Sequence, residues 1–264
     1  EWNCWRRFIG KNDSHKWIVA AETGAGGHKH WQVRMRTRYK DVIIPVPGMT
    51  KGKKIPGIAM ANLDLREMWA KDGRQVHVEE CTSSNWTYES KEGRFIASWD
   101  SYAVRQLRFG HYTKAQEWAV KLLDATNDRE IMVWYDPDGS AGKSWLVAHL
   151  FENGGAYITA PYQDTIQGMV QTIASQVKQD RDEGYMPRKY VIIDMPRSWH
   201  WSEKLYVAIE AIKDGLIIDP RYSTNIVNIR GSKVIVLTNQ KPQLGKLSKD
   251  RFRLYDGIPF TPLT

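Results

Sequence analysis

The stretch IMVWYDPDGSAGKSWLVAHL, residues 131–150, predicts the architecture of the C-terminal half of this chain. Five apolar, strand-favouring residues lead into a turn with two glycines, and Lys143 and Ser144 then open a predicted helix. In such a turn, backbone N–H groups bind phosphate oxygens, the Lys neutralises the outer phosphates, and the Ser hydroxyl ligates Mg²⁺. The sequence therefore predicts a nucleotide-phosphate site whose ATP-binding residues are Gly139, Gly142, Lys143 and Ser144.

Two later strands support this prediction. The spacing GxxxxGK[ST] is not met in full, because Pro137 occupies the first glycine position, so the structural context carries the motif. VIID ends in Asp194, which suits an Mg²⁺ held through water, and KVIVLTN ends in Asn239, which suits orientation of the attacking water. Buried strands that end in polar residues are also ordinary sheet architecture, but three such elements in order predict an ATPase on a parallel α/β sheet.

The N-terminal half contains a strand with two unlike faces. In HKHWQVRMRTRYK, residues 28–40, alternate side chains share a face, which puts the two histidines, the glutamine and a row of arginines together. The opposite face carries Trp31, Val33, Met35 and Tyr39, which suit a core. The first face is competent for metal binding at His30 and Gln32. Its arginines, Arg34, Arg36 and Arg38, are predicted to follow DNA phosphates, with a solvated edge strand as the alternative.

The remaining pattern divides the chain into two domains. Strands are predicted at 17–22, 30–39 and 75–80, a helix at 62–71, and a mobile basic loop at 45–60, which together give an α+β domain over 1–100. Residues 101–114 have no firm periodicity and are predicted to be a linker. A helix is predicted at 115–124, and the α/β domain covers 115–264.

Composition narrows the choice of partners and compartment. The net charge of +8 favours polyanionic partners. Two cysteines, Cys4 and Cys81, supply neither a disulfide framework nor a thiolate zinc site, which favours a reducing compartment. No apolar run approaches the roughly 18 residues of a membrane helix, and no signal peptide is visible, so no membrane partner is expected.

A second constellation lies in NWTYESKEG, residues 85–93. If this segment is helical, Tyr88 and Lys91 share one face, with Ser84 or Asn85 able to cap its start and Gly93 able to end it. A tyrosine can attack a phosphodiester and stay attached when a metal polarises the phosphate, and an ammonium beside it stabilises charge. Tyr-x-x-Lys alone is nearly always a helix surface. Here the motif gains significance because Glu22, His30 and Gln32 offer metal ligands in the same domain.

Together these residues resemble the replication-initiator (Rep) proteins of small circular single-stranded DNA viruses, and several phrases look most like the smacovirus branch of this circovirus-like group. HWQ at 30–32 matches the family's His-hydrophobic-Gln strand, AAETG offers the preceding glutamate, and YESK matches Tyr-x-x-Lys. DPDGSAGKS, VIIDMP and LTNQKP match, in order, the nucleotide-binding, acidic and Asn motifs of a superfamily 3 helicase domain. The resemblance covers nearly the whole chain and implies an HUH-type endonuclease domain followed by that helicase domain.

The resemblance implies a function and a set of roles. Mg²⁺ or Mn²⁺ held by Glu22, His30 and Gln32 would polarise the scissile phosphate at an origin stem-loop, and Tyr88 would form a 5′-phosphotyrosine with Lys91 beside it. ATP with Mg²⁺ would drive a homo-oligomeric ring, expected to be a hexamer, along single-stranded DNA. Arg251 is the candidate arginine finger, with a plain surface role as the alternative, and Arg230 fits a DNA-contacting loop. Host replication machinery would be the further partner, in the host cell and in its nucleus if the host is eukaryotic.

Three departures from the family pattern stand out. No counterpart of the N-terminal strand motif precedes Trp17, and we expect that strand to lie outside this sequence. Met195 follows Asp194 where many relatives carry a second acidic residue, and Asp136 stands where they often have Gly, at an expected cost in backbone freedom. Two alternatives stay open: a non-cleaving DNA-binding fragment with an ATPase domain, and a helicase that acts on RNA.

Overall fold

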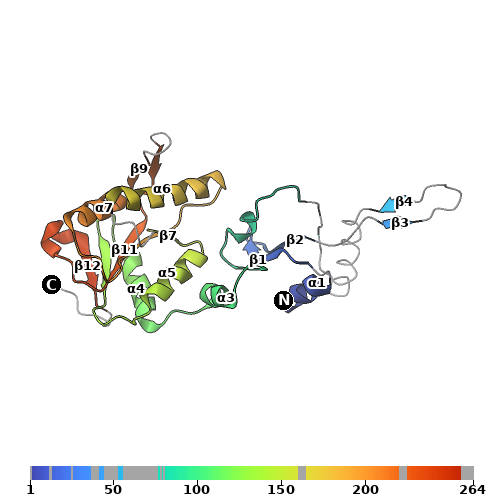
Figure 1. Ribbon diagram of the computed structural model, residues 1–264, viewed down its shortest axis with the longest axis horizontal. Coiled ribbons are helices and arrows are strands. Elements are labelled where there is room, and N and C mark those ends of the chain that lie inside the picture. Colours follow the sequence, from blue (N-terminus) through green and yellow to red (C-terminus); the bar gives the residue numbers. More distant parts are fainter. Residues whose placement is uncertain are drawn as a thin grey trace. The chain divides into compact units, whose positions relative to one another are not determined.

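The computed structural model describes residues 2–11, 14–24, 26–36, 42–44, 53–55, 77, 79, 81–159, 165–219 and 225–256 (Figure 1). The chain forms two compact units, Glu1–Ser101 and Tyr102–Thr264. Mixed α/β structure is present in both, with a small antiparallel sheet in the first and a parallel sheet in the second. Across the described ranges, no helix combines the length and the apolar character needed to cross a membrane.

The first unit is built on a three-stranded antiparallel sheet in the order β2-β1-β5. Its strands are β1 (Trp17–Thr23), β2 (Lys29–Met35) and β5 (Phe95–Ala97). Helix α1 (Trp2–Lys11) covers one face, where its Trp5 and Ile9 pack on Val19 and on the odd-numbered side chains of β2. The predicted core role of Trp31, Val33 and Met35 is thereby confirmed, and the even-numbered side chains of β2 lie on the other face.

The second unit is a five-stranded parallel sheet in the order β12-β6-β11-β8-β7. Its strands are β6 (Ile131–Tyr135), β7 (Ala156–Ile158), β8 (Tyr190–Asp194), β11 (Lys233–Thr238) and β12 (Phe252–Tyr255). Because β11 lies between β6 and β8, the carboxyl ends of these three strands adjoin at one edge of the sheet. The predicted parallel α/β sheet is confirmed, and its order brings the three expected nucleotide motifs together.

Helices cover both faces of this sheet (Figure 1). Helices α4 (Lys114–Asp124) and α5 (Lys143–Glu152) pack on one face around the buried Trp134. Helices α6 (Ile166–Asp182) and α7 (Glu203–Asp214) pack on the other face. The β9–β10 hairpin (Leu216–Asp219 with Asn225–Asn228) joins that second core through its buried Ile217 and Val227. Two short 3-10 turns, η3 (Leu244–Lys246) and η4 (Lys249–Arg251), precede β12.

Several local predictions differ from the structure. The expected linker 101–114 contains helix α3 (Tyr102–Phe109), which is tied to α5 because the imidazole Nδ1 of His149 lies 2.6 Å from the carbonyl oxygen of Leu107. Arg108 of α3 also pairs with Glu152 of α5 at 2.8 Å, a contact between distant residues that local periodicity does not show. The expected basic loop 45–60 contains β4 (Lys53–Ile55), paired with β3 (Val42–Ile44). The predicted strand 30–39 is described as far as residue 36, the helix 62–71 lies outside the described residues, and residues 77 and 79 are not in a strand.

Candidate functional site

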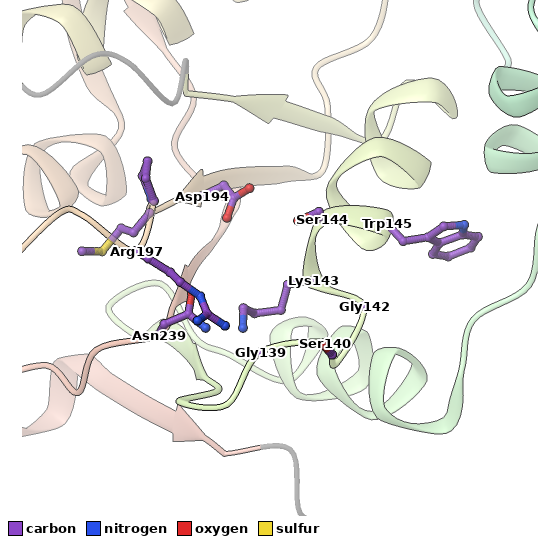
Figure 2. A pocket seen from close by; sticks show the side chains of 11 residues that line it. Gly139, Ser140, Gly142, Lys143, Ser144, Trp145, Asp194, Arg197 and Asn239 are labelled. Atoms are coloured by element: carbon purple, nitrogen blue, oxygen red, sulfur yellow. The ribbon is translucent and has the colours of Figure 1, made fainter.

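The glycine-rich turn between β6 and α5 has the backbone of a phosphate-binding loop. Gly139 and Gly142 have φ values of +84° and +82°, a region that glycine occupies at little cost. Gly142 is the N-cap of α5, so the helix begins at Lys143 with its unpaired N–H groups beside the loop. A pocket of about 550 Å³ opens there, lined by the loop and by the ends of β8 and β11 (Figure 2). The elements are therefore arranged as the sequence predicted.

The carboxylate of Asp136 is at the centre of this loop. Its oxygens accept hydrogen bonds from the backbone N–H groups of Gly139 at 2.9 Å and Ala141 at 3.4 Å, and from Lys143 Nζ at 2.7 Å. Burial raises the pKa of Asp136, but the bonds from Lys143 and Gly139 outweigh it and hold the pKa below its usual value. Asp136 itself has a negative φ, since Ser140 is the one described non-glycine residue with a positive φ, so its backbone is not strained here.

The other two motifs face the same pocket. Asp194 ends β8 and Asn239 follows β11, and the Nδ2 atom of Asn239 donates to the carbonyl oxygen of Asp136 at 2.5 Å. Burial raises the pKa of Asp194, and the positive charge of Lys143 offsets only part of that rise. In Figure 2, Lys143 and Ser144 lie between these two side chains and Trp145. The pocket thus has a polar end suited to phosphate and water and an aromatic end.

Among the residues lining the pocket that the sequence did not predict, Arg197 and Trp145 bring side chains that can bind a ligand. Arg197 lines it from the loop after β8 and donates to the carbonyl oxygen of Asp138 at 2.9 Å. Trp145 stacks on His149, with ring centroids 4.8 Å apart and planes 17° from parallel. The position of Arg197, three residues after the acidic strand end, was the available signal for the first. The tryptophan follows the Lys-Ser pair directly, but a helical aromatic is ordinarily a core residue, so the sequence carried no clear signal for it.

In the first unit, Glu22 and His30 are direct cross-strand partners on β1 and β2. His30 Nε2 lies 3.6 Å from Glu22 Oε2, and Gln32 follows on the same face of β2. Glu22 is only 4% exposed, and its Oε1 atom has no hydrogen-bond partner in the described part of the protein. His28 lies outside β2 and is exposed.

Tyr88 and Lys91 are brought to this sheet face by a short 3-10 turn, η2 (Tyr88–Ser90), rather than by the α-helix that the sequence suggested. Lys91 Nζ lies 3.0 Å from Glu22 Oε2 and 3.9 Å from the centroid of the Tyr88 ring. Burial lowers the pKa of Lys91, but hydrogen bonds with Tyr88 and Glu22 outweigh it and hold the pKa above its usual value. Tyr88 is 53% exposed, so its hydroxyl is open to a ligand beside a fixed positive charge.

Hydrogen bonds on both sides of η2 stabilise this turn, and the sequence partly indicated them. η2 ends at Ser90, with Lys91 as its C-cap, and Gly93, with a φ of +71°, follows it and donates its N–H to the carbonyl oxygen of Ser90. Thr87 is the residue before the turn and makes no side-chain cap. Asn85 instead accepts the Thr87 N–H through Oδ1 at 2.9 Å, which shapes the approach to the turn.

The guanidinium of Arg34 is bound by groups of the protein itself, so this side chain does not lie on an open cationic face. Its guanidinium donates to the carbonyl oxygens of Ser83 and Asn85, lies 3.8 Å from Glu89 Oε1, and lies 4.3 Å from the centroid of the Trp86 ring. The side chain is 9% exposed. Arg34 therefore fixes the segment that carries Tyr88 onto β2.

The other predicted arginines have diverse surroundings. Arg36 and Arg230 are exposed, and Arg38 lies outside the described residues. Arg251, the candidate arginine finger, is turned toward α7, where it lies 3.2 Å from Glu210 Oε1 and 3.1 Å from Asp214 Oδ1. Both partners belong to the same chain, so these contacts are those of a residue that fixes α7.

The donor set at Glu22 is compatible with a divalent cation but is small. Within the described residues, no group of three or more His, Cys, Asp and Glu side chains is placed to hold a metal ion. The unpaired Oε1 atom of Glu22 and the imidazole of His30 nevertheless give two donors, and the amide of Gln32 on the same face offers a third. Oxygen and imidazole donors completed by water suit Mg²⁺ or Mn²⁺, so these three residues fit the ion that the sequence implied.

Comparison with known proteins places the chain among distant relatives of viral replication proteins. No family model matches it. It is 26% identical to Para-Rep C6 of Subterranean clover stunt C6 alphasatellite over 72% of this chain and 61% of that protein. It is 32% identical to Para-Rep C2 of Milk vetch dwarf C2 alphasatellite over 49% of this chain and 42% of that protein.

A third relative carries a different name. The chain is 26% identical to the master replication protein of Faba bean necrotic yellows virus over 66% of its own length and 56% of that protein. The chain thus spans between about two fifths and three fifths of the lengths of these three relatives. It is distantly homologous to the Rep and master replication proteins of circular single-stranded DNA viruses and their alphasatellites.

Proposed function

We propose that this chain acts in rolling-circle replication, as an initiator that cuts and rejoins single-stranded origin DNA through Tyr88 and unwinds DNA with ATP hydrolysis. The observation that carries the proposal is the convergence of Tyr88 and Lys91 with Glu22 and His30, from separate segments, on one sheet face. The distant homology and the phosphate-binding loop of the second unit support it. The resemblance of several phrases to the smacovirus branch of Rep proteins is part of the same proposal.

In the proposed cleavage step, Tyr88 is the nucleophile, as the resemblance to Rep proteins implies. Its hydroxyl oxygen attacks the scissile phosphorus, the bond from phosphorus to the 3′ oxygen breaks, and the proton of the phenol passes to that oxygen. The products are a 5′-phosphotyrosine and a free 3′ hydroxyl, and the reverse reaction rejoins the strand. Lys91 stays protonated at neutral pH because its pKa is raised, so it stabilises the developing negative charge and does not act as the base.

Glu22, His30 and Gln32 would hold the divalent cation, Mg²⁺ or Mn²⁺, and that cation would polarise the scissile phosphate. Glu22 has a second task, because its Oε2 atom orients the Lys91 ammonium at 3.0 Å. One carboxylate thus sets the distance between the ammonium and the metal-binding oxygen. The same contact keeps Lys91 beside the Tyr88 ring.

The second unit would bind ATP with Mg²⁺ as substrate. Lys143 and the loop N–H groups bind the outer phosphates, Ser144 and Asp194 hold the Mg²⁺ of the nucleotide, and Asn239 orients the attacking water. Gly139 and Gly142 let the backbone approach the phosphates. A ring of chains, expected to be a hexamer, would translocate on single-stranded DNA, with Arg230 as the candidate for DNA contacts. Arg251 would act as the arginine finger between subunits only after leaving its ion pairs with Glu210 and Asp214. Host replication machinery would extend the 3′ hydroxyl.

Two substitutions test the proposal on one protein preparation. Tyr88→Phe keeps the ring and removes the nucleophilic oxygen, so it should form no covalent adduct with a labelled origin oligonucleotide while keeping its ATPase rate. Lys143→Ala should do the reverse. Tyr102→Phe is the matched control, since Tyr102 is 76% exposed and lies on α3, and it should change neither activity. A denaturation-resistant DNA adduct in Tyr88→Phe would contradict the assignment, as would ATP hydrolysis by Lys143→Ala.

A further inference from the structure

The phosphate-binding loop carries an anion of its own. The donors that such a loop offers to a nucleotide phosphate are backbone N–H groups and the lysine at the start of the helix. Here the N–H groups of Gly139 and Ala141 and the ammonium of Lys143 all donate to the carboxylate of Asp136. Asp136 is 8% exposed, so water does little to weaken these bonds. A carboxylate therefore occupies the donors that a phosphate needs.

The same carboxylate is anchored from behind. The N–H of Asp136 donates to the carbonyl oxygen of Thr238 at 3.0 Å, and its carbonyl oxygen accepts from Asn239 at 2.5 Å. The backbone of this residue is thus fixed to the end of β11. Only its side chain can leave the loop, by rotation about its own bonds. Binding of nucleotide is then an exchange of one anion for another at Lys143.

We propose that Asp136 is a specificity-determining residue, whose carboxylate must be displaced from the loop and which thereby limits the site to nucleoside polyphosphates. This inference rests on the proposed ATP site. A lone orthophosphate can replace only the bonds that the carboxylate already makes, so it gains little. A triphosphate with Mg²⁺ would add contacts of its ion with Ser144 and Asp194 and of its phosphates with Arg197, and these additional contacts drive the exchange.

The test compares Asp136→Asn with Asp138→Asn by calorimetric titration of ATP with Mg²⁺ and of orthophosphate. Asp138 belongs to the same loop and is exposed, so its variant changes the loop charge equally without touching the Lys143 contact. We expect Asp136→Asn to bind ATP about tenfold more tightly, which corresponds to about 1.4 kcal/mol. It should also gain measurable binding of orthophosphate, whereas Asp138→Asn should stay within about twofold of the parent protein.

Asp136→Ser is the second variant if the amide destabilises the loop, since a hydroxyl can still accept from Gly139 without charge. Unchanged or weaker ATP binding in the folded variants would show that the carboxylate holds the loop in its binding shape and would overturn the inference. The proposed ATP site would survive that result if the parent protein binds ATP. Absence of ATP binding in the parent and in both variants would contradict the inference and the ATP site together.

Discussion

Arg34 offers a test of how the candidate nuclease site is held together, through the substitution Arg34→Met. Methionine keeps much of the length and apolar volume over Trp86 but removes the guanidinium. Glu89, which is 5% exposed, then loses its cation at 3.8 Å, and the carbonyl oxygens of Ser83 and Asn85 lose their donor. Breaking a buried ion pair in this way costs about 3–5 kcal/mol. The two carbonyl groups lie on exposed residues, so water replaces most of their loss.

Protonation of Glu89 limits this cost at low pH. Burial already raises the pKa of Glu89, and the charge of Arg34 is one of the effects that hold it down. Without Arg34 the folded-state pKa rises further above the unfolded value of about 4.5, so the carboxylate destabilises the variant at high pH and becomes neutral as the pH falls. The loss of stability in Arg34→Met should therefore be larger at pH 8 than at pH 5.

Thermal unfolding and adduct formation measure the effect. A loss of about 3 kcal/mol in a unit of this size lowers its midpoint by roughly 10 °C or more. Adduct formation should fall because the segment that carries Tyr88 loosens from β2, and ATP hydrolysis should not change. The double variant Arg34→Met, Glu89→Gln should recover most of both losses, since it removes the buried charge together with its partner. Arg36→Met, a change at an exposed neighbour, is the control.

The sequence predicts that Arg34 follows DNA phosphates, with a solvated edge strand as the alternative, and the same variants decide between DNA binding and the structural role. A DNA-binding arginine would leave the unfolding midpoint unchanged when replaced, would weaken DNA binding with a smaller salt dependence, and would not be rescued by Glu89→Gln. That result would refute the structural role.

Two further predictions concern the two sites separately. His30→Ala should eliminate metal-dependent cleavage and Gln32→Ala should reduce it strongly, whereas His28→Ala, a change outside the strand, should alter it only modestly. Metal titration of adduct formation checks this. An inactive His28→Ala beside an active His30→Ala would show that the metal ligands lie in a different register. Because the pKa of Asp194 is raised, acidification protonates its carboxylate at a higher pH than that of an ordinary Asp, and ATP hydrolysis should fall there. Since Mg²⁺ binds the deprotonated carboxylate, a higher Mg²⁺ concentration should move this fall to lower pH. A pH profile of kcat/KM at two Mg²⁺ concentrations checks the second, and an acid limb that ignores Mg²⁺ would count against Asp194 as a ligand.

Much of the candidate nucleotide site could be predicted because its motifs are local. A strand, a glycine turn and a helix start lie within twenty residues, and polar residues that end buried strands gather at one sheet edge in any parallel sheet. The position of β11 between β6 and β8 is not local, and neither are the contacts of Asp136. From the sequence alone, Asp136 stands where relatives often have glycine, with an expected cost in backbone freedom. Only the fold shows that its side chain returns to Gly139, Ala141 and Lys143.

The candidate nuclease site was predictable to the level of a shared face. Alternation along β2 correctly separated His30 and Gln32 from the core residues. The pairing of Glu22 with His30 depends on the register of the β1–β2 hairpin, which alternation does not determine. The contacts of Arg34 depend on a segment about fifty residues later in the chain, so a pattern within one strand could show only that Arg34 is cationic.

The two sites share one electrostatic arrangement, and the difference between them has a consequence. Each keeps a lysine against a carboxylate, Lys143 with Asp136 at 2.7 Å and Lys91 with Glu22 at 3.0 Å, because a partly buried ammonium needs an anion nearby. Asp136 takes both the lysine and the loop N–H groups, so a phosphate must displace it. Glu22 gives one oxygen to Lys91 and keeps Oε1 unpaired, so a cation can bind without breaking the pair. Nucleotide binding should therefore compete with an internal anion, whereas metal binding at the candidate nuclease site should add to an existing pair and leave Lys91 in place beside Tyr88.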